Sequence, residues 1–146
     1  MTFCALTKSD VRLLTELYQG NFPDGWSEKM LIDAFDGGRF IAIGALDNEK
    51  LIGAITCSIS FEDADIEGVV TDKEYRRRGV AYSLITKAEQ VLKEKGVTKI
   101  LLEVRQSNAP AISTYQKAGF NKLSVRKKYY GDGEDAVVMI KEIFGK

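Results

Sequence analysis

The stretch Val69 to Leu92, VVTDKEYRRRGVAYSLITKAEQVL, changes its hydrophobic period halfway along and so decides the fold. Its first residues end a run from Ala64, ADIEGVV, in which polar and apolar residues alternate as in a half-buried strand. After Gly79 the apolar residues recur at helical spacing, which predicts a helix that ends at Gly96. The stretch is therefore predicted to be a strand, an arginine-rich turn and a helix.

The turn Arg76-Arg77-Arg78-Gly79-Val80-Ala81 has the chemistry of an anion site. The first amides of a helix lack partners inside the helix and carry the positive end of its dipole. Gly79 permits close approach of the backbone, and arginines add charge-assisted hydrogen bonds to phosphate oxygens. Taken alone, the pattern equally fits solvated arginines at a loop tip. The Lys-Ser/Thr pair of a Walker loop and the third glycine of a dinucleotide fingerprint are missing, and a pyrophosphate is the ligand that suits this turn.

The elements on either side of this stretch predict a mixed sheet. Further helices are predicted from Val11 to a stop at Gly20, after the N-cap Ser27, and over Asn108 to Ala118; further strands begin at Arg39, Leu51 and Thr98 and flank Gly131 to Gly133. The order helix, helix, three strands, helix, strand, helix and two strands predicts an α/β (α+β) fold in which antiparallel hairpins precede crossover helices.

The composition describes an ordinary globular protein. The 146 residues predict a single domain over residues 1–146. Lys plus Arg and Asp plus Glu number 21 each, so no direct nucleic-acid partner and no membrane partner is expected, and charge-driven binding must be local. The start of the chain lacks an export signal and no long apolar run follows, which predicts a cytoplasmic protein.

The absence of histidine excludes several kinds of chemistry. Hydrolases that need a histidine base and most zinc enzymes are ruled out. Cys4 and Cys57 are far apart, have no metal-ligand spacing and stand beside apolar residues, so both are expected to be buried free thiols and no metal is expected. Carboxylates, tyrosine, lysine, cysteine or backbone amides must carry any reaction.

The chain resembles the GNAT superfamily of acetyl-CoA-dependent N-acetyltransferases. Val69-Val70-Thr71, the turn Arg76 to Ala81 and the helix through Leu92 match, in order, its strand, [QR]-x-x-G-x-[GA] turn and helix. More narrowly, LLEVRQSNAPAISTYQKAGF from Leu101 and RKKYYGDGEDAVVM from Arg126 resemble its RimI branch, and the resemblance covers nearly the whole chain. It implies a GNAT fold: a mixed, mostly antiparallel central sheet with a splayed parallel strand pair, flanked by about four helices.

The resemblance also implies an activity and a coenzyme site. The RimI branch transfers an acetyl group from acetyl-CoA to protein N-termini, typically of a small-subunit ribosomal protein. A monomer or weak homodimer that transfers the group directly in a ternary complex is expected. The implied coenzyme contacts are Val69, Val70, Thr71, Arg76, Arg77, Arg78, Gly79, Val80, Ala81, Tyr82 and Asn108, with a backbone amide of Val69 to Thr71 as the oxyanion donor.

Three carboxylates are candidates for the general base. Glu103 interrupts the apolar strand KILLEV and shares a face with Leu101 and Arg105, where it can also serve as a simple partner of Arg105 or a solvated strand end. The resemblance to the RimI base position favours Glu103. Asp65 and Glu67 alternate onto one face of the preceding strand and are the rival bases, or else an exposed polar face.

Two further residues belong to the helix after Glu103. Tyr115 follows Ile112 by three residues, which by pattern alone suits a core aromatic; the resemblance implies that it faces the coenzyme sulfur and acts as general acid. Asn108 precedes Pro110 as a helix N-cap, and the resemblance adds a coenzyme contact. The two roles of Asn108 are compatible.

The acceptor side is expected to involve Trp26, Glu67, Tyr129 and Tyr130. The alternatives are a hydrophobic staple between Trp26 and Leu31 and strand packing of the tyrosine pair. RimI-type enzymes usually carry proline directly before this tryptophan, whereas this chain has Gly25, so peptide specificity is the property in question.

Other functions share these motifs. The acceptor can instead be a polyamine, an amino acid or an antibiotic, or the chain can be a non-catalytic acetyl-CoA-binding module. Cys57 offers a covalent route, but its apolar strand gives no sign of a lowered thiol pKa.

Overall fold

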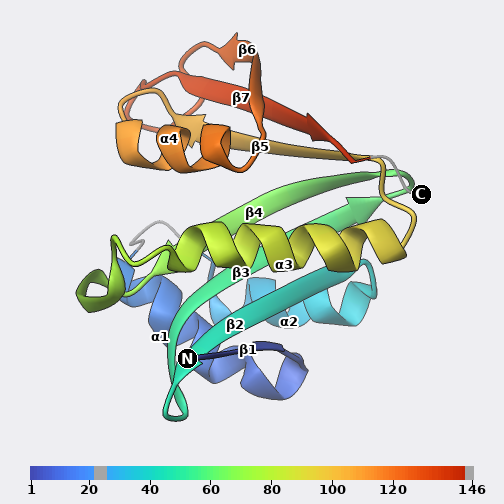
Figure 1. Ribbon diagram of the computed structural model, residues 1–146, viewed down its shortest axis with the longest axis vertical. Coiled ribbons are helices and arrows are strands. Elements are labelled where there is room, and N and C mark those ends of the chain that lie inside the picture. The colour runs from blue at the N-terminus through green and yellow to red at the C-terminus, as the bar shows by residue number, and fades with distance from the viewer. Residues whose placement is uncertain (22–25, 144–146) are drawn as a thin grey trace.

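The computed structural model describes residues 1–21 and 26–143, which form a seven-stranded sheet and four α-helices (Figure 1). The strands are β1 (Thr2–Ala5), β2 (Phe40–Asp47), β3 (Lys50–Ser60), β4 (Asp63–Thr71), β5 (Lys99–Arg105), β6 (Asn121–Arg126) and β7 (Ala136–Glu142). The α-helices are α1 (Val11–Asn21), α2 (Glu28–Gly37), α3 (Val80–Glu94) and α4 (Ala109–Lys117), and short 3-10 helices are η1 (Lys8–Asp10) and η2 (Lys73–Tyr75).

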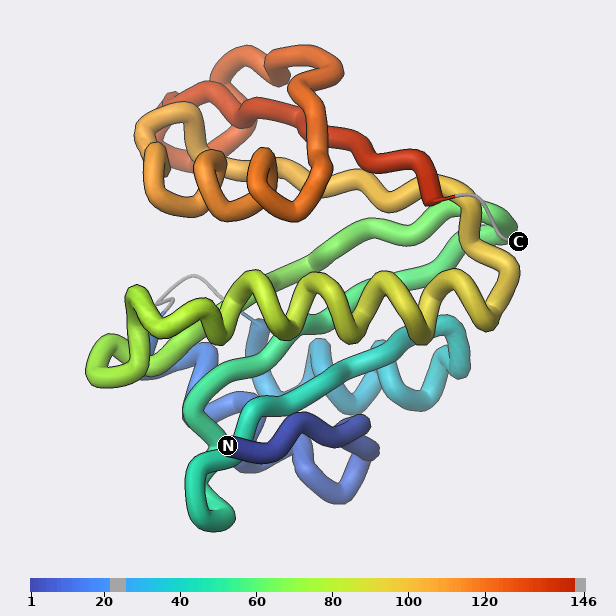
Figure 2. The backbone as a smooth tube through the Cα atoms, viewed as in Figure 1, coloured from blue at the N-terminus to red at the C-terminus, as the bar shows by residue number. Residues whose placement is uncertain are grey.

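The strand order is β1-β2-β3-β4-β5-β7-β6, and β4 with β5 is the parallel pair while the other neighbouring strands are antiparallel. The predicted mixed, mostly antiparallel sheet is therefore confirmed. Figure 2 shows that the chain completes the β1 to β4 half of the sheet, with α1 and α2, before α3 leads to the β5 to β7 half.

Helices cover both faces of the sheet. Helices α1 and α2 lie behind β2 to β4 and α3 lies in front, with α4 on the α3 side of β5 and β7 (Figure 1). The core on the α3 side includes Leu84, Leu102 and Phe120, whereas the smaller core under α1 and α2 includes Leu14 and Leu31. The helical apolar stripe after Gly79 thus faces the sheet as predicted.

Local signals fix the ends of α2 and α3. The Ser27 hydroxyl accepts a hydrogen bond from the Met30 amide at 3.2 Å, and the left-handed Gly38 ends the helix at a φ of 76°. Gly79 begins α3 in the left-handed region at a φ of 77°. These boundaries agree with the predicted N-cap and turn.

Three predictions at the N-terminal end were wrong. Strand β1 was not predicted, because four residues without alternation give no period to detect. Cys4 is exposed rather than buried, since β1 is an edge strand, while Cys57 is buried. Helix α1 continues through Gly20 to Asn21, whose Nδ2 donates to the Leu17 carbonyl oxygen at 2.9 Å and so satisfies an end group of the helix.

A lysine on β7 connects α3 to α4. Lys141 Nζ donates to Glu89 Oε1 at 2.6 Å and to the Ala118 carbonyl oxygen at 2.8 Å, and all three groups are largely shielded from solvent. Because Glu89 belongs to α3 and Ala118 ends α4, this contact fixes how far apart the two helices lie.

Candidate active site

The site is created where β4 and β5 stop pairing. Their ladder contains Asp63 with Lys99, Ala64 with Ile100 and Asp65 with Leu101. Both strands continue, β4 to Thr71 and β5 to Arg105, but in the described ranges no strand pairs with the β5 side of β4 beyond Asp65. Backbone groups of Val69 to Thr71 are thereby left open on that side, as the resemblance implied.

A cavity of about 730 Å³ lies on the α3 and α4 side of this opening. It is lined by Asn21, Val69, Val70, Thr71, Tyr75, Arg76, Arg77, Gly79, Val80, Ala81, Tyr82, Asn108, Pro110, Ala111, Ser113, Thr114, Tyr115 and Lys117. Every residue predicted to contact the coenzyme lines this cavity except Arg78. The lining residues that sequence analysis did not predict are Asn21, Tyr75, Pro110, Ala111, Ser113, Thr114 and Lys117. Asn21 reaches the cavity from α1, so its contribution depends on how separate elements meet.

The three arginines of the turn point in different directions. Arg77 adopts a left-handed φ of 65°, which turns the chain between its neighbours. Arg76 Nε donates to the Thr71 carbonyl oxygen and its Nη2 to Asn21 Oδ1, each at 3.1 Å. Arg78 instead lies over the ring of Tyr75, with Cζ 5.2 Å from the ring centroid. Arg77 is therefore the cavity-lining arginine for which the structure gives no competing contact among the described residues.

The start of α3 offers unpaired amides to the cavity. The first hydrogen bond of the helix runs from the Ser83 amide to the Gly79 carbonyl oxygen, and Gly79 provides no side-chain cap. The amides of Val80, Ala81 and Tyr82 therefore precede the helical ladder. With the helix dipole and Arg77 beside them, these amides fit a pyrophosphate.

Helix α4 forms the opposite wall. Asn108 Oδ1 accepts from the Ala111 amide at 3.2 Å, so the predicted N-cap is confirmed, and Asn108 also lines the cavity. Tyr115 packs edge-on against Phe120, with ring centroids 6.0 Å apart, and reaches the cavity. Burial raises the pKa of the Tyr115 hydroxyl above its ordinary value, so the group stays protonated at neutral pH and can donate a proton.

Glu103 lies on the other face of the sheet. Its β5 neighbours Leu102 and Val104 are buried in the core under α3, so alternation directs Glu103 away from that core. Tyr129 donates to Glu103 Oε1 at 3.2 Å, and Arg126 Nε lies 3.2 Å from Oε2. With 31% of its side chain exposed, Glu103 remains open to solvent between these partners.

Arg105 does not pair with Glu103. Its Nη1 contacts Asp132 at 2.8 Å and Glu134 at 3.0 Å, and its guanidinium lies 4.1 Å from the ring centroid of Tyr130. The alternative in which Glu103 merely neutralises Arg105 is therefore wrong.

The rival carboxylates lie beside a β-bulge in β4. Thr56 of β3 pairs with Gly68 and Cys57 with Ile66, so Glu67 is the extra residue. Glu67 accepts a hydrogen bond from the Ser58 hydroxyl. Partial burial, followed by the charges of Glu67 and Glu103, raises the pKa of Asp65, which indicates that the three carboxylates share one region.

The aromatic residues expected to contact the acceptor divide into two groups. Tyr129 and Tyr130 lie in the β6–β7 loop with their rings edge-to-face and 5.1 Å apart, next to Glu103. Trp26 stacks on Phe40 at 5.4 Å and packs into the core with Leu31, which supports the staple interpretation. Gly25 lies outside the described residues.

Cys57 gives no support to a covalent route. It is fully buried, and burial followed by the charges of Glu67 and Asp65 raises the pKa of its thiol. A thiol held neutral in this way is a poor nucleophile.

The described residues contain no group of three or more cysteine, aspartate or glutamate side chains that could hold a metal ion. They also contain no helix that is long and apolar enough to cross a membrane.

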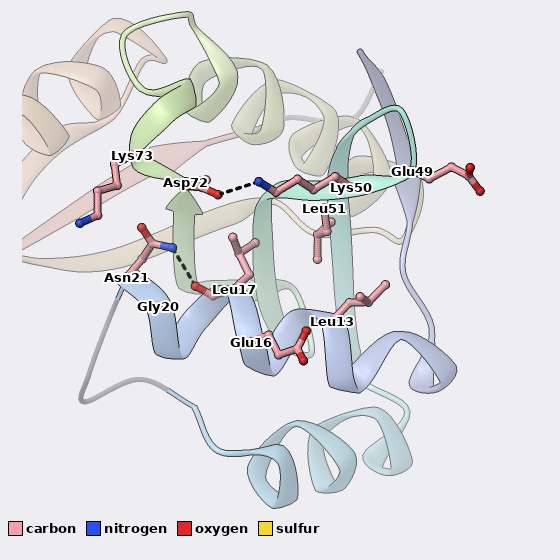
Figure 3. A pocket seen from close by; sticks show the side chains of 10 residues that line it. All are labelled: Leu13, Glu16, Leu17, Gly20, Asn21, Glu49, Lys50, Leu51, Asp72 and Lys73. Atoms are coloured by element: carbon pink, nitrogen blue, oxygen red, sulfur yellow. Dashed lines mark hydrogen bonds and ion pairs between the residues drawn. The ribbon is translucent and has the colours of Figure 1, made fainter.

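A second cavity, of about 320 Å³, shares the lining residue Asn21 with the first, and Figure 3 shows the side chains around it. Its lining comes from α1, the β2–β3 turn and the segment after β4, and is formed by Leu13, Glu16, Leu17, Gly20, Asn21, Glu49, Lys50, Leu51, Asp72 and Lys73. Lys50 and Asp72 pair across it at 3.8 Å. Asn21, the last residue of α1, lines both cavities.

Together, the fold and the site define an acyltransferase that takes its acyl group from a phosphate-bearing carrier. The chain belongs to the acetyltransferase (GNAT) family, whose model matches residues 11–120. It is therefore an N-acetyltransferase that uses acetyl-CoA.

Comparison with known proteins identifies relatives that match nearly the whole chain and one that matches about half of it. The chain is 30% identical over 141 residues to the ribosomal protein bS18-alanine N-acetyltransferase of Escherichia coli (strain K12), covering 94% of this chain and 95% of the relative. The crystal structure of the Escherichia coli ribosomal-protein-S18-alanine N-acetyltransferase has a TM-score of 0.90, with 30% identity over 99% of this chain and 95% of that chain. The N-alpha-acetyltransferase of Saccharolobus solfataricus is 44% identical over 72 residues, 49% of this chain and 43% of the relative.

The fold alone does not select the acceptor. An aminoglycoside 6′-N-acetyltransferase complexed with coenzyme A superimposes with a TM-score of 0.84 at 16% identity, covering 100% of this chain and 99% of that chain. Acceptor choice therefore depends on the residues around the site rather than on the fold.

Proposed function

We propose that this enzyme acetylates the N-terminal α-amine of a protein, with a small-subunit ribosomal protein as the acceptor class. The observation that carries the proposal is the position of Glu103 on one face of the sheet, at the opening whose other face holds the coenzyme cavity. The similarity over nearly the full chain to relatives named for a ribosomal protein's alanine supports the same acceptor.

An α-amine suits a site with one modest base. At pH 7 an α-amine with a pKa of about 7.9 is neutral about a tenth of the time, whereas a lysine with a pKa of about 10.4 is neutral only about once in 2,500. A strong base is therefore not needed to deprotonate an α-amine, and Glu103, acting directly or through one water, is sufficient. Tyr129 and Arg126 hold its two oxygens in place.

The proposed transfer is direct. The amine nitrogen bonds to the thioester carbonyl carbon as the carbon–sulfur bond breaks, Glu103 accepts the proton from nitrogen, and Tyr115 supplies one to the departing thiolate. Arg77 and the first amides of α3 hold the pyrophosphate, Asn108 contacts the carrier, and an amide of Val69 to Thr71 stabilises the developing oxyanion. Glu67 and Tyr130 flank the acceptor.

All of these groups belong to one chain, which supports activity as a monomer or weak dimer with residues 1–146 as one domain. A cytoplasmic location remains a prediction from the sequence.

A thiol-release assay with acetyl-CoA tests the acceptor. Peptides beginning Ala-Arg, Ser or Met are compared with free lysine and spermidine, and an Ala-Arg peptide with a blocked N-terminus and an internal lysine is the matched control. We expect release with free N-termini and none with the control. Activity on small amines alone would overturn the acceptor assignment, and coenzyme binding without transfer to any amine would indicate a non-catalytic module.

A further inference from the structure

The hydroxyl of Tyr18 lies directly against the strand that forms the inner end of the coenzyme cavity. Tyr18 is 2% exposed, and its Oη lies 2.7 Å from Thr56 Oγ1 in a buried hydrogen bond. A Cβ atom placed on Gly68 would lie 2.5 Å from the same Oη. The tyrosine hydroxyl therefore occupies the space where any other residue at Gly68 would have its side chain.

Gly68 is the first residue after the bulge, and the bulge decides which way the following backbone faces. Before it, Ala64 and Ile66 pack into the core under α3; after it, Val70 packs into the core under α1. The extra residue Glu67 thus shifts the alternation by one, and Val69 becomes the residue that faces the cavity side. A bulge leaves one residue unpaired and disrupts the ladder locally, so contacts from outside the strand contribute more to its geometry.

We propose that Tyr18 is a positioning residue for acetyl transfer, because its hydrogen bond to Thr56 and its contact with Gly68 hold the bulge that aims the Val69 amide at the thioester carbonyl. The inference rests on the proposed placement of the thioester beside Val69. An oxyanion donor is effective only when it is already aligned before the charge develops. Tyr18 supplies that alignment from helix α1, without touching the substrate.

The same turn of α1 also contacts the arginine turn from Arg76 to Ala81, through a hydrogen bond between Asn21 and Arg76. Asn21, three residues after Tyr18, accepts a hydrogen bond from Arg76 Nη2 at 3.1 Å. Figure 3 shows its other hydrogen bond, in which Asn21 donates to the Leu17 carbonyl oxygen. Tyr18 thus acts near the acyl end of the carrier and Asn21 near its phosphates. The two contacts are expected to affect different kinetic constants.

Tyr18→Phe and Thr56→Val test the hydrogen bond from both sides. Each variant keeps the shape of its side chain, and each is expected to lower kcat about tenfold while the Kd for coenzyme A changes less than about twofold. The double variant should be no slower than the slower single variant, because both changes remove the same interaction. Asn21→Ala should show the opposite pattern, a raised KM for acetyl-CoA with little change in kcat.

Thr15→Val is the matched control. Thr15 lies one turn earlier on α1, and within the described residues its buried Oγ1 has no hydrogen-bond partner. Replacing an unsatisfied hydroxyl with a methyl group of similar shape should leave kcat unchanged without lowering the melting temperature.

The carbonyl stretching frequency of bound [1-¹³C]acetyl-CoA gives a second measurement, which a loss of folding stability alone would not change. The wild-type enzyme should lower this frequency relative to the free thioester, and Tyr18→Phe should lower it less. The proposal is overturned if Tyr18→Phe keeps kcat within about twofold of wild type, a change too small for a misaligned oxyanion donor. It is equally overturned if kcat and coenzyme affinity fall together with the frequency unchanged, or if both Tyr18→Phe and Thr56→Val fail to fold.

These outcomes can be separated from failure of the proposed function. The variants are measured with whichever amine the wild-type enzyme acetylates, so an inactive peptide would remove the acceptor assignment while the comparison continues with the small amine. If the wild-type enzyme acetylates no amine at all, both the proposed function and the role of Tyr18 would be overturned.

Discussion

Asp65 and Leu101 are the last residues that pair across β4 and β5, and the groups assigned to chemistry lie beyond them on the two diverging strands or on α4. The carboxylate side and the coenzyme side of this opening belong to opposite faces of the sheet. Variants on the two faces should therefore alter different steps.

Glu103→Gln should lower kcat by about 100-fold or more, because the amide still accepts a hydrogen bond from Tyr129 but cannot accept the proton of the amine. Steady-state thiol release at saturating substrates measures this. Glu67→Gln is the matched comparison on β4, and we expect a much smaller loss. A loss below about threefold for Glu103→Gln would remove its role as base and make Glu67 the next residue to test.

Tyr115→Phe should also lower kcat by about 100-fold or more, since the ring contact with Phe120 remains while the proton donor is lost. Because burial raises the pKa of Tyr115, the hydroxyl should stay protonated up to at least pH 10, and the wild-type rate should show no alkaline loss from this group below that pH. An unchanged melting temperature would confirm that the variant reports on chemistry. A nearly full rate would show that another donor protonates the thiolate.

Arg77→Gln and Arg78→Gln separate two neighbouring arginines of the turn. Arg77 lines the cavity, whereas Arg78 does not and lies over the ring of Tyr75. We expect Arg77→Gln to raise the KM for acetyl-CoA about tenfold, the loss of one charge-assisted phosphate contact, and Arg78→Gln to raise it less than about threefold. Equal effects of the two variants would contradict this assignment.

Stability should fall as the pH rises above about 8.5, the ordinary pKa of a thiol. Burial raises the pKa of Cys57 in the folded protein, so above that pH the unfolded chain has lost a proton that the folded chain keeps. The unfolded state then binds fewer protons, and the free energy of unfolding decreases with pH. The buried hydroxyls of Tyr18 and Tyr115 add to this decrease above about pH 10.

Melting temperatures between pH 7 and pH 10 measure this slope, and Cys57→Ala should flatten it below pH 10 even though the smaller side chain lowers stability at every pH. The same variant should retain normal turnover if Cys57 takes no covalent part. A slope that Cys57→Ala leaves unchanged would assign the pH dependence to other groups.

Helix ends were predictable from the sequence because they depend on neighbouring residues. Ser27, Gly79 and Asn108 each mark a helix start through one local hydrogen bond or one backbone conformation. The apolar stripe of α3 is equally local. These signals, with the resemblance, were enough to predict the turn from Arg76 to Ala81, whose residues other than Arg78 line the cavity.

Other features depend on contacts between distant parts of the chain. The three arginines are chemically alike, and the left-handed Arg77 separates their directions in a way that no composition rule predicts. Trp26 lies against Phe40, a contact set by how α2 docks on β2. From the helical pattern alone, Tyr18 is predicted to be one more apolar residue of α1. Its contact with Gly68 depends on the register of β3 and β4, which the pattern does not reveal.

In the proposed mechanism, the positions of Glu103 and Tyr115 on opposite faces of the sheet give each reactant its own route to the reacting atoms. A client polypeptide can arrive from one side while the acyl donor already occupies the other. Coenzyme A can then leave and be replaced by acetyl-CoA without any need for the polypeptide to dissociate first. Neither exchange requires a hydrogen bond of the sheet to break, since the strands are already parted at that point.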